Sequence, residues 1–361
     1  MNKQKICIAP LDWGLGHATR CIHLAKSLMQ LDYQIYIASE GYHEVILREA
    51  LPEATFLPLA GYRIQYSKDG KWFLLKMLAQ IPKILFSIYY ERNWLRKMQQ
   101  QFQFDIIISD NRFGFHHKKV PSVFITHQLN IQTGFELTNS IARWLQYRYI
   151  KKFSSLWIPD IEGNNNYAGL LSNPKVKPNM PIWYLGALSR LSPSIEKTTY
   201  EPIQFLGIVS GPEPQRTIFE NALWMQGNTS DTAFALVAGR PVGNNEPSLS
   251  NKGKLYPHAN GATLAALIAS AEYIIFRGGY TSLMELIPFQ KKLIIIPTPG
   301  QTEQEYLATW WESNGWAISF SQENFKIKEA LMKAASIEFT QPPFQSFSIE
   351  TLKDKLKDLT L

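Results

Sequence analysis

Short apolar runs alternate with segments of helical periodicity along both halves of the 361-residue chain. This alternation is typical of strand–helix–strand units, which assemble into parallel sheets. A parallel sheet brings the carboxyl ends of its strands to one edge, where ligands bind. The expected strands span residues 5–9, 34–38, 105–109, 122–126 and 155–158 in the first half, and residues 204–209, 232–237, 273–276 and 292–297 in the second.

Helices are expected where apolar residues recur every three or four positions. Leu24, Leu28 and Leu31 give this pattern over residues 19–31. The other expected helices span residues 216–225, 261–269, 281–287, 303–313, 325–335 and 349–359. We therefore predict an α/β protein with two doubly wound, Rossmann-like domains that face each other across a cleft.

The domain boundary is expected in residues 173–194, a stretch with four prolines and no sustained periodicity. The prediction is an N-terminal domain over residues 1–187, followed by a linker over 188–202 and a C-terminal domain over 203–340. The last helix, within 341–361, is expected to cross back to the first domain.

Two cysteines, Cys7 and Cys21, are too few for a disulfide framework or a zinc knuckle and fit a reducing cytoplasm. The first 20 residues lack the apolar run of a signal peptide. No stretch reaches the roughly 18 apolar residues that a membrane-spanning helix needs. We expect a cytoplasmic protein, either soluble or held peripherally at the inner face of the membrane.

The net charge of +7 is uneven, because residues 1–185 hold 22 Lys and Arg against 13 Asp and Glu, which leaves 15 against 17 for the rest. A basic half indicates an anionic partner such as nucleic acid, acidic lipid or phosphate. Residues 61–98 hold eight basic residues against two acidic ones, and residues 72–95 are rich in aromatic side chains. This segment suits an anionic membrane surface or a hydrophobic acceptor tail. Pro82 predicts two short helices here, and the alternative is that the apolar positions pack on the first sheet.

The densest polar motif, residues 12–20, follows the first expected strand. Gly14 and Gly16 let backbone N–H groups approach an anion at the start of a helix. His17 stands at the mouth of this helix, where it can act as general base toward a substrate hydroxyl or water. The alternative is that the glycines only shape the turn and that His17 only caps the helix.

A second strand, glycine turn and helix run through residues 276–285, where backbone N–H groups can cradle a diphosphate. Glu285 can accept hydrogen bonds from both hydroxyls of a ribose, although a solvated helix glutamate is the alternative. The candidate residues for binding a sugar donor in this stretch are Arg277, Gly278, Gly279, Tyr280, Thr281 and Glu285.

Two further strand ends in the second half carry polar side chains. Gln301 and Gln304 offer amide groups suited to sugar hydroxyls. Ser210 and Gly211 form another glycine turn, and Arg216 behind it can reach a phosphate.

In the first half, Asp110 and His127 end two neighbouring strands. Either can orient an acceptor hydroxyl or share the base role with His17.

Taken together, the turn from Gly14 to His17, the stretch from Arg277 to Glu285 and the stretch 297–304 resemble glycosyltransferase family 28. That family includes the N-acetylglucosaminyltransferase that makes lipid II and the plant galactolipid synthases. The resemblance implies a GT-B fold, with an N-terminal acceptor domain, a C-terminal nucleotide-sugar domain and an inverting, metal-independent transfer. UDP is the nucleotide that the family uses by default, and no cofactor is expected.

The resemblance implies a role for individual residues. Gly14, Gly16 and His17 match the glycine-rich loop and its histidine, Glu285 matches the ribose-binding glutamate, and Gln304 matches the glutamine that holds the donor sugar. Two features depart from the pattern. Leu307 stands where the family usually has asparagine, and the first loop lacks one glycine. No Asp-x-Asp sequence occurs, so the chain lacks the divalent-cation-binding motif of the other large glycosyltransferase fold.

The stretch from Gly14 to Arg20 is also similar to the nucleotide-sugar hydrolase of pseudaminic acid synthesis, whose histidine activates water. We favour the transferase because a small-molecule hydrolase does not need the apolar and basic segment. The prediction is therefore transfer from a nucleotide diphosphate-sugar to a hydroxyl acceptor, expected to be lipid-linked or membrane-associated, with a hydrolase or epimerase as the alternative. Nucleic acid is not expected as a partner, because the basic residues mingle with aliphatic ones and no reader motif occurs.

Overall fold

The computed structural model describes residues 3–12, 15–63, 79–131, 136–193, 200–211, 213–240, 246–250 and 252–360. These residues form two compact units. One unit runs to Leu188 and resumes at Gln345, and the other extends from Ser189 to Phe344. The expected boundary after residue 187 lies beside this division, and the C-terminal helix belongs to the first unit.

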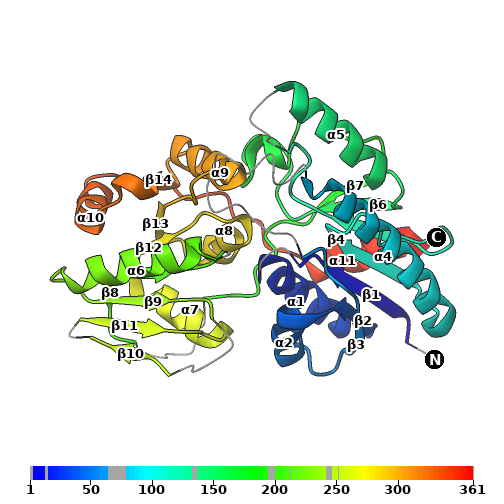
Figure 1. Cartoon of the computed structure of the whole chain (residues 1–361), viewed down its shortest axis with the longest axis horizontal. Helices are drawn as coiled ribbons and strands as arrows, with labels where there is room; N and C mark the ends of the chain where they lie inside the picture. The colour runs from blue at the N-terminus through cyan, green and yellow to red at the C-terminus, as the bar shows by residue number, and fades with distance from the viewer. Residues whose placement is uncertain are drawn as a thin grey trace. The chain divides into compact units, whose positions relative to one another are not determined.

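The first unit is built on a parallel sheet with the strand order β3-β2-β1-β4-β5-β6-β7 (Figure 1). Its strands are β1 (Lys5–Pro10), β2 (Gln34–Ser39), β3 (Thr55–Pro58), β4 (Ile106–Asp110), β5 (Ser122–Ile125), β6 (Ser155–Ile158) and β7 (Ile182–Tyr184). The central strands are apolar and buried on both faces, as parallel strands covered by helices must be. The direction in which successive strands are added to the sheet reverses between β1 and β4. Doubly wound sheets bind ligands at such a switch point.

Helices cover both faces of this sheet. They are α1 (Leu15–Gln30), α2 (Gly41–Ala50), α4 (Ile81–Phe102), α5 (Glu136–Ile150) and α11 (Ile349–Thr360), with a 3-10 turn at Gly169–Leu171. Leu95 of α4 packs on Cys7 and Ile107, and Ile150 of α5 packs on Leu156, so α4 and α5 share one face. Side chains of neighbouring strand residues alternate between faces, and α1 packs on the opposite side of β1 and β2.

Helix α4 corrects the prediction of two short helices around Pro82. From Ile81 to Phe102 the chain forms one helix, and Pro82 lies in its first turn, where a missing N–H costs no intrahelical hydrogen bond. The basic, aromatic segment begins before α4. Its residues 64–78 lie outside the described residues. Helices α2 and α5 were not predicted, and α1 begins at Leu15 instead of residue 19.

The second unit repeats the doubly wound plan with the order β10-β11-β9-β8-β12-β13-β14. Its strands are β8 (Ile203–Ile208), β9 (Phe234–Val237), β10 (Ser248–Leu249), β11 (Gly253–Tyr256), β12 (Ala271–Phe276), β13 (Lys292–Ile295) and β14 (Ala317–Ser319). All are parallel except β10, which pairs antiparallel with β11. The helices are α6 (Gln215–Asn228), α7 (Gly261–Ser270), α8 (Tyr280–Leu286), α9 (Thr302–Ser313) and α10 (Ile327–Ala335), with 3-10 turns at Ile287–Phe289 and Gln322–Asn324.

The core of this unit lies between the sheet and helices α6 and α10, where Phe205, Phe219 and Ile294 are buried together. The order reverses between β8 and β12, as it does between β1 and β4 in the first unit. The predicted α/β class with two Rossmann-like domains is confirmed.

A buried ion pair fixes α4 to the loops at the carboxyl edge of the first sheet. Arg112 Nε donates to Glu91 Oε1 at 2.6 Å, and both side chains are buried. Glu91 Oε2 accepts from the Tyr62 hydroxyl at 3.0 Å and from the Gly114 N–H at 2.9 Å, while Arg112 Nη2 donates to the Ala60 carbonyl at 2.6 Å. Burial raises the pKa of Glu91, although Arg112 and the other hydrogen bonds oppose this shift. Because each polar group is paired, the network stabilises the edge only while both charges are present.

Replacing Arg112 by Met should lower the free energy of unfolding by about 3–5 kcal/mol, because Glu91 is then left buried without its counter-charge. Denaturant unfolding of both proteins measures the loss. The control is Glu162→Gln, which breaks an exposed ion pair with Lys177 and should cost about 1 kcal/mol or less. Equal losses in the two variants would contradict the structural role of the buried pair.

Candidate active site

The carboxylate of Asp110 is the centre of the polar site in the first unit. Asp110 is the last residue of β4, and its neighbour in the sheet is Pro10, the last residue of β1. The alternation of side chains along β4 turns Asp110 to the same face as Ile108. Helix α1, which follows β1, packs on that face, so the carboxylate meets residues of the first turns of α1.

Three residues of α1 contact this carboxylate. Arg20 donates from Nε to Asp110 Oδ2 at 2.8 Å and from Nη2 to Oδ1, and both side chains are buried. Cys21 Sγ lies 3.5 Å from Oδ2. His17 Nδ1 lies 3.1 Å from the same oxygen. His127 joins the cluster from the end of β5, with Nδ1 3.3 Å from Arg20 Nη1. The three predicted residues His17, Asp110 and His127 therefore lie in one cluster.

The tautomer of His17 decides what this histidine can do. Its Nδ1 lies 3.1 Å from Asp110 Oδ2 and 2.8 Å from Arg20 Nη2. A guanidinium only donates hydrogen bonds, so Nδ1 can accept from Arg20 when it carries no proton, or donate to Asp110 when it does. Only the second tautomer leaves Nε2 without a proton and able to accept one.

The charges in the cluster set its protonation at neutral pH. Burial lowers the pKa of His17, Asp110 raises it and Arg20 lowers it further, so that the net shift is downward and the imidazole is neutral. Burial alone would raise the pKa of Asp110, but Arg20 and then His17 hold it well below its usual range. The site therefore contains an ionised Asp110–Arg20 pair beside a neutral histidine whose side chain is 13% exposed.

Arg20 is the residue that the sequence prediction left out of this cluster. It lies three positions after His17, which places both on the same side of α1. Of the two predicted glycines, Gly16 lies in the first turn of α1, where its carbonyl accepts from the Thr19 hydroxyl at 3.0 Å. Gly14 lies outside the described residues.

In the second unit, two glycine turns follow the strands at the switch point. Ser210 and Gly211 follow β8, and Gly278 and Gly279 follow β12. Gly211 has a φ of 107° and Gly278 a φ of 74°, which is the left-handed region that glycine favours. A Cβ on Gly278 would stand 2.5 Å from Ile295 Cγ2, so no side chain fits there. At Gly279, the residue before α8, a Cβ would meet nothing within 4 Å, and the backbone there has open space beside it.

The predicted sugar-donor residues on α8 and α9 have partners within the second unit. Glu285 Oε1 accepts from Arg190 Nε at 2.6 Å, and both side chains are partly buried. Gln304 Oε1 accepts from the Thr298 N–H at 2.8 Å and so fixes the loop after β13. Gln301 is the residue before α9. Arg190 was not predicted, because nothing in its local sequence indicates an ion pair with a residue 95 positions away.

Two predicted arginines bind other groups of the second unit. Arg277 is 1% exposed, and its guanidinium donates to Gln322 Oε1 at 2.5 Å and to the Gln215 carbonyl at 2.8 Å. It lies 4.0 Å over the Phe219 ring, and burial lowers its pKa to about 10. These contacts tie the end of β12 to α6. Arg216 pairs with Glu213, and its Nη1 donates to the Ala238 carbonyl at 3.2 Å.

Within the described ranges, no group of three or more His, Cys, Asp or Glu side chains is arranged to hold a metal ion. None of the helices described is both long enough and apolar enough to cross a membrane.

Two more of the predicted donor residues lie at the start of α8. Tyr280 is buried, and Thr281 beside it is partly exposed.

Replacing Asp110 by Asn should destabilise the protein at pH 7 by about 3–5 kcal/mol, because Arg20 then stays buried without its counter-charge. The pKa of Asp110 is lower in the folded than in the unfolded protein. Its stabilising effect is therefore complete above the unfolded value and is lost as the pH falls toward the folded one. Urea unfolding at several pH values should show that the wild type and the variant differ most above about pH 5. A difference that grows below pH 4 would contradict this role for Asp110.

Comparison with known proteins finds a family match in the C-terminal part of the chain. Residues 244–353 match the Glycosyltransferase family 28 C-terminal domain. An uncharacterized glycosyltransferase of Methanosarcina acetivorans is 22% identical over 370 residues, covering 92% of this chain and 90% of the relative. One from Methanosarcina mazei is 21% identical over 346 residues, covering 88% and 86%.

Solved structures show the same fold. Arabidopsis thaliana UGT89C1 in complex with quercetin aligns with a TM-score of 0.68 at 13% identity, covering all of both chains. Acinetobacter baumannii MurG aligns with a TM-score of 0.55 at 12% identity, covering 99% of this chain and all of MurG. The two doubly wound units and these matches agree with the resemblance found in the sequence: the chain is a glycosyltransferase with the GT-B fold, and its residues 244–353 are similar to the family 28 C-terminal domain.

Proposed function

We propose that the protein transfers a sugar from a nucleoside diphosphate-sugar to a hydroxyl acceptor with inversion at the anomeric carbon. The observation that carries this proposal is the contact between His17 Nδ1 and the ionised carboxylate of Asp110 at the switch point of the first sheet. A neutral histidine next to a carboxylate is the usual arrangement for removing a proton from a hydroxyl.

In this mechanism His17 is the general base. With its Nδ1 proton donated to Asp110, Nε2 accepts the proton of the acceptor hydroxyl. The acceptor oxygen attacks the anomeric carbon, the bond to the diphosphate breaks, and the nucleoside diphosphate leaves from the opposite face. Asp110 stabilises the imidazolium that forms, and Arg20 keeps Asp110 ionised and in place. His127 contacts Arg20 and is assigned a positioning role.

The sugar donor is assigned to the second unit. Its glycine turns after β8 and β12 offer backbone N–H groups at the switch point, which suit a diphosphate without a metal. Glu285 is the candidate for the ribose hydroxyls, and Gln304 and Gln301 for the sugar. UGT89C1 was also solved in complex with UDP-L-rhamnose, which supports a UDP-sugar as the donor class. Arg277 is assigned a positioning role, because its guanidinium is buried.

The acceptor is proposed to be a lipid presented at an anionic membrane surface. Exposed apolar side chains gather on α4 and α5, among them Phe86 and Trp144 at 67% and 60% exposure. These helices are neighbours, because Ile84 and Ile88 of α4 and Tyr149 of α5 belong to one apolar cluster. Both helices also carry basic residues. Their positive charge favours binding to a membrane surface with anionic headgroups.

Replacing His17 by Ala should lower kcat by about 100- to 10,000-fold, the usual contribution of a general base, and should leave the Kd of the sugar donor unchanged. In the wild type, the rate should begin to fall only below the ordinary histidine pKa of about 6.5, because His17 must stay neutral and its pKa is lowered. Steady-state kinetics across pH and donor titration of both proteins measure these effects.

The control for this experiment is His43→Ala, which removes a partly exposed histidine of α2 and should leave kcat and its pH profile unchanged. Normal turnover in His17→Ala would remove His17 from the base role. If His17→Ala lost both donor binding and turnover, the substitution would have impaired folding, and the loss of kcat would not report on the base role.

Replacing Phe86 and Tyr89 together by Ser should release the protein from vesicles that contain anionic lipid, because both side chains are exposed apolar groups of α4. Stability should be nearly unchanged, since neither side chain is buried. Co-flotation with vesicles of phosphatidylcholine and phosphatidylglycerol measures the effect. The control is Met332→Ser on α10, an equally exposed apolar residue of the second unit. Flotation that persists in the double variant would contradict membrane binding through α4.

A further inference from the structure

The first unit has a polar pocket at the amino edge of its sheet, whereas His17, Asp110 and His127 lie at the carboxyl edge. The pocket encloses about 770 Å³. It lies beside the starts of β5 and β6, and its lining comes from the loop before β5, the segment between α5 and β6, and one residue of α4. No step of the proposed sugar transfer uses these residues.

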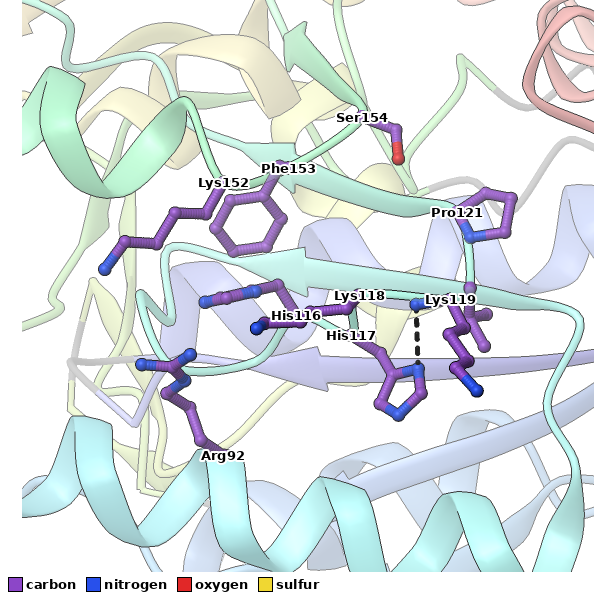
Figure 2. A pocket seen from close by; sticks show the side chains of 10 residues that line it. Arg92, His116, His117, Lys118, Lys119, Pro121, Lys152, Phe153 and Ser154 are labelled. Atoms are coloured by element: carbon purple, nitrogen blue, oxygen red, sulfur yellow. Dashed lines mark hydrogen bonds between the residues drawn. The ribbon is translucent and has the colours of Figure 1, made fainter.

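The lining is strongly basic. Arg92, Lys118, Lys119 and Lys152 all line the pocket, and the described residues around it include no Asp or Glu. None of these four side chains forms an ion pair within the described part of the chain. Figure 2 shows the cationic ends of Arg92, Lys118 and Lys152 on the same side as the His116 ring, whereas His117 and Lys119 extend to the other side. Like charges held together without a counter-charge favour the binding of an anion.

A buried histidine without a partner lies in the same place. His116 is 8% exposed, and its Nε2 has no hydrogen-bond partner among the described residues. The ring packs edge-on against Phe153, at 5.2 Å between centroids. Burial, followed by the charges of Arg92, Lys152 and His117, lowers the pKa of His116 to about 4. A buried polar atom without a partner is unusual in a folded protein and calls for a ligand or a water.

We propose that this pocket binds a phosphate group, with Arg92, Lys118 and Lys152 balancing its charge and the buried His116 forming part of its wall. Arginine and lysine are the side chains that bind phosphate in proteins, arginine through two parallel hydrogen bonds. The group can belong to a free phosphate compound or to the headgroup of a phospholipid. The exposed positions of Lys118, Lys152 and Ser154 leave the pocket open to either source.

The test is isothermal titration of the full chain with inorganic phosphate at constant ionic strength. Saturable binding is expected, and Arg92→Gln and Lys152→Gln should each raise the Kd by about tenfold, the effect of losing one charge-assisted hydrogen bond. The control is Lys151→Gln, which removes the neighbouring exposed lysine, a residue that does not line the pocket, and should leave the Kd nearly unchanged. Because the substituted side chains are not buried, these variants should remain folded, which thermal unfolding verifies.

Vesicle co-flotation then separates the two sources of the phosphate group. Vesicles of phosphatidylcholine with phosphatidic acid present a phosphomonoester, and the matched vesicles carry phosphatidylserine. If binding to phosphatidic acid exceeds binding to phosphatidylserine and falls in Arg92→Gln, the site takes a lipid headgroup. If phosphate binds but flotation does not depend on Arg92, the site takes a free phosphate compound. Phosphate binding that is absent, or equal in the wild type, Arg92→Gln and Lys152→Gln, would overturn the proposal.

Discussion

The contact on which the rest of the first unit's chemistry depends is the buried pair of Asp110 and Arg20. Two parallel strands end side by side at the switch point, and the carboxylate at the end of β4 is held by an arginine on the helix that follows β1. This pair fixes the first turns of α1 against the sheet. It therefore also fixes His17, which lies one turn before Arg20 and shares the same carboxylate oxygen. The ionised carboxylate offers an acceptor to His17 Nδ1, and donation to it is the tautomer that the proposed base role requires.

Three buried arginines each connect a strand end, or the loop after it, to a helix. Arg20 binds Asp110, Arg112 binds Glu91 and backbone carbonyls, and Arg277 binds Gln322 and the Gln215 carbonyl. The guanidinium suits this task because it donates several hydrogen bonds in fixed directions. The carboxyl edges of both sheets are thus held by buried charged side chains.

Much of the fold could be predicted from the sequence, because buried parallel strands have continuous apolar runs such as residues 106–109. The residues of the first site were also predictable, since Asp110 and His127 end neighbouring strands and His17 opens the helix after another. Helices α2 and α5 were missed, and α4 was expected as two short helices, because exposed apolar residues blur the periodicity of these segments. The buried position of Arg277 could not be predicted, since a short motif does not indicate which way a side chain points. Arg190 and Glu285 meet only through the tertiary fold.

A quantitative analysis of the products formed from nucleotide sugars shows whether His17 activates an acceptor hydroxyl or water. The purified protein is incubated with UDP-, GDP-, dTDP- and CMP-sugars, with and without a lipid extract, and the released nucleotide and sugar products are quantified. We expect one nucleoside diphosphate-sugar to be consumed only when the extract is present, with the sugar recovered on a lipid at inverted anomeric configuration. Release of free sugar from the donor alone would contradict this expectation and would make His17 an activator of water.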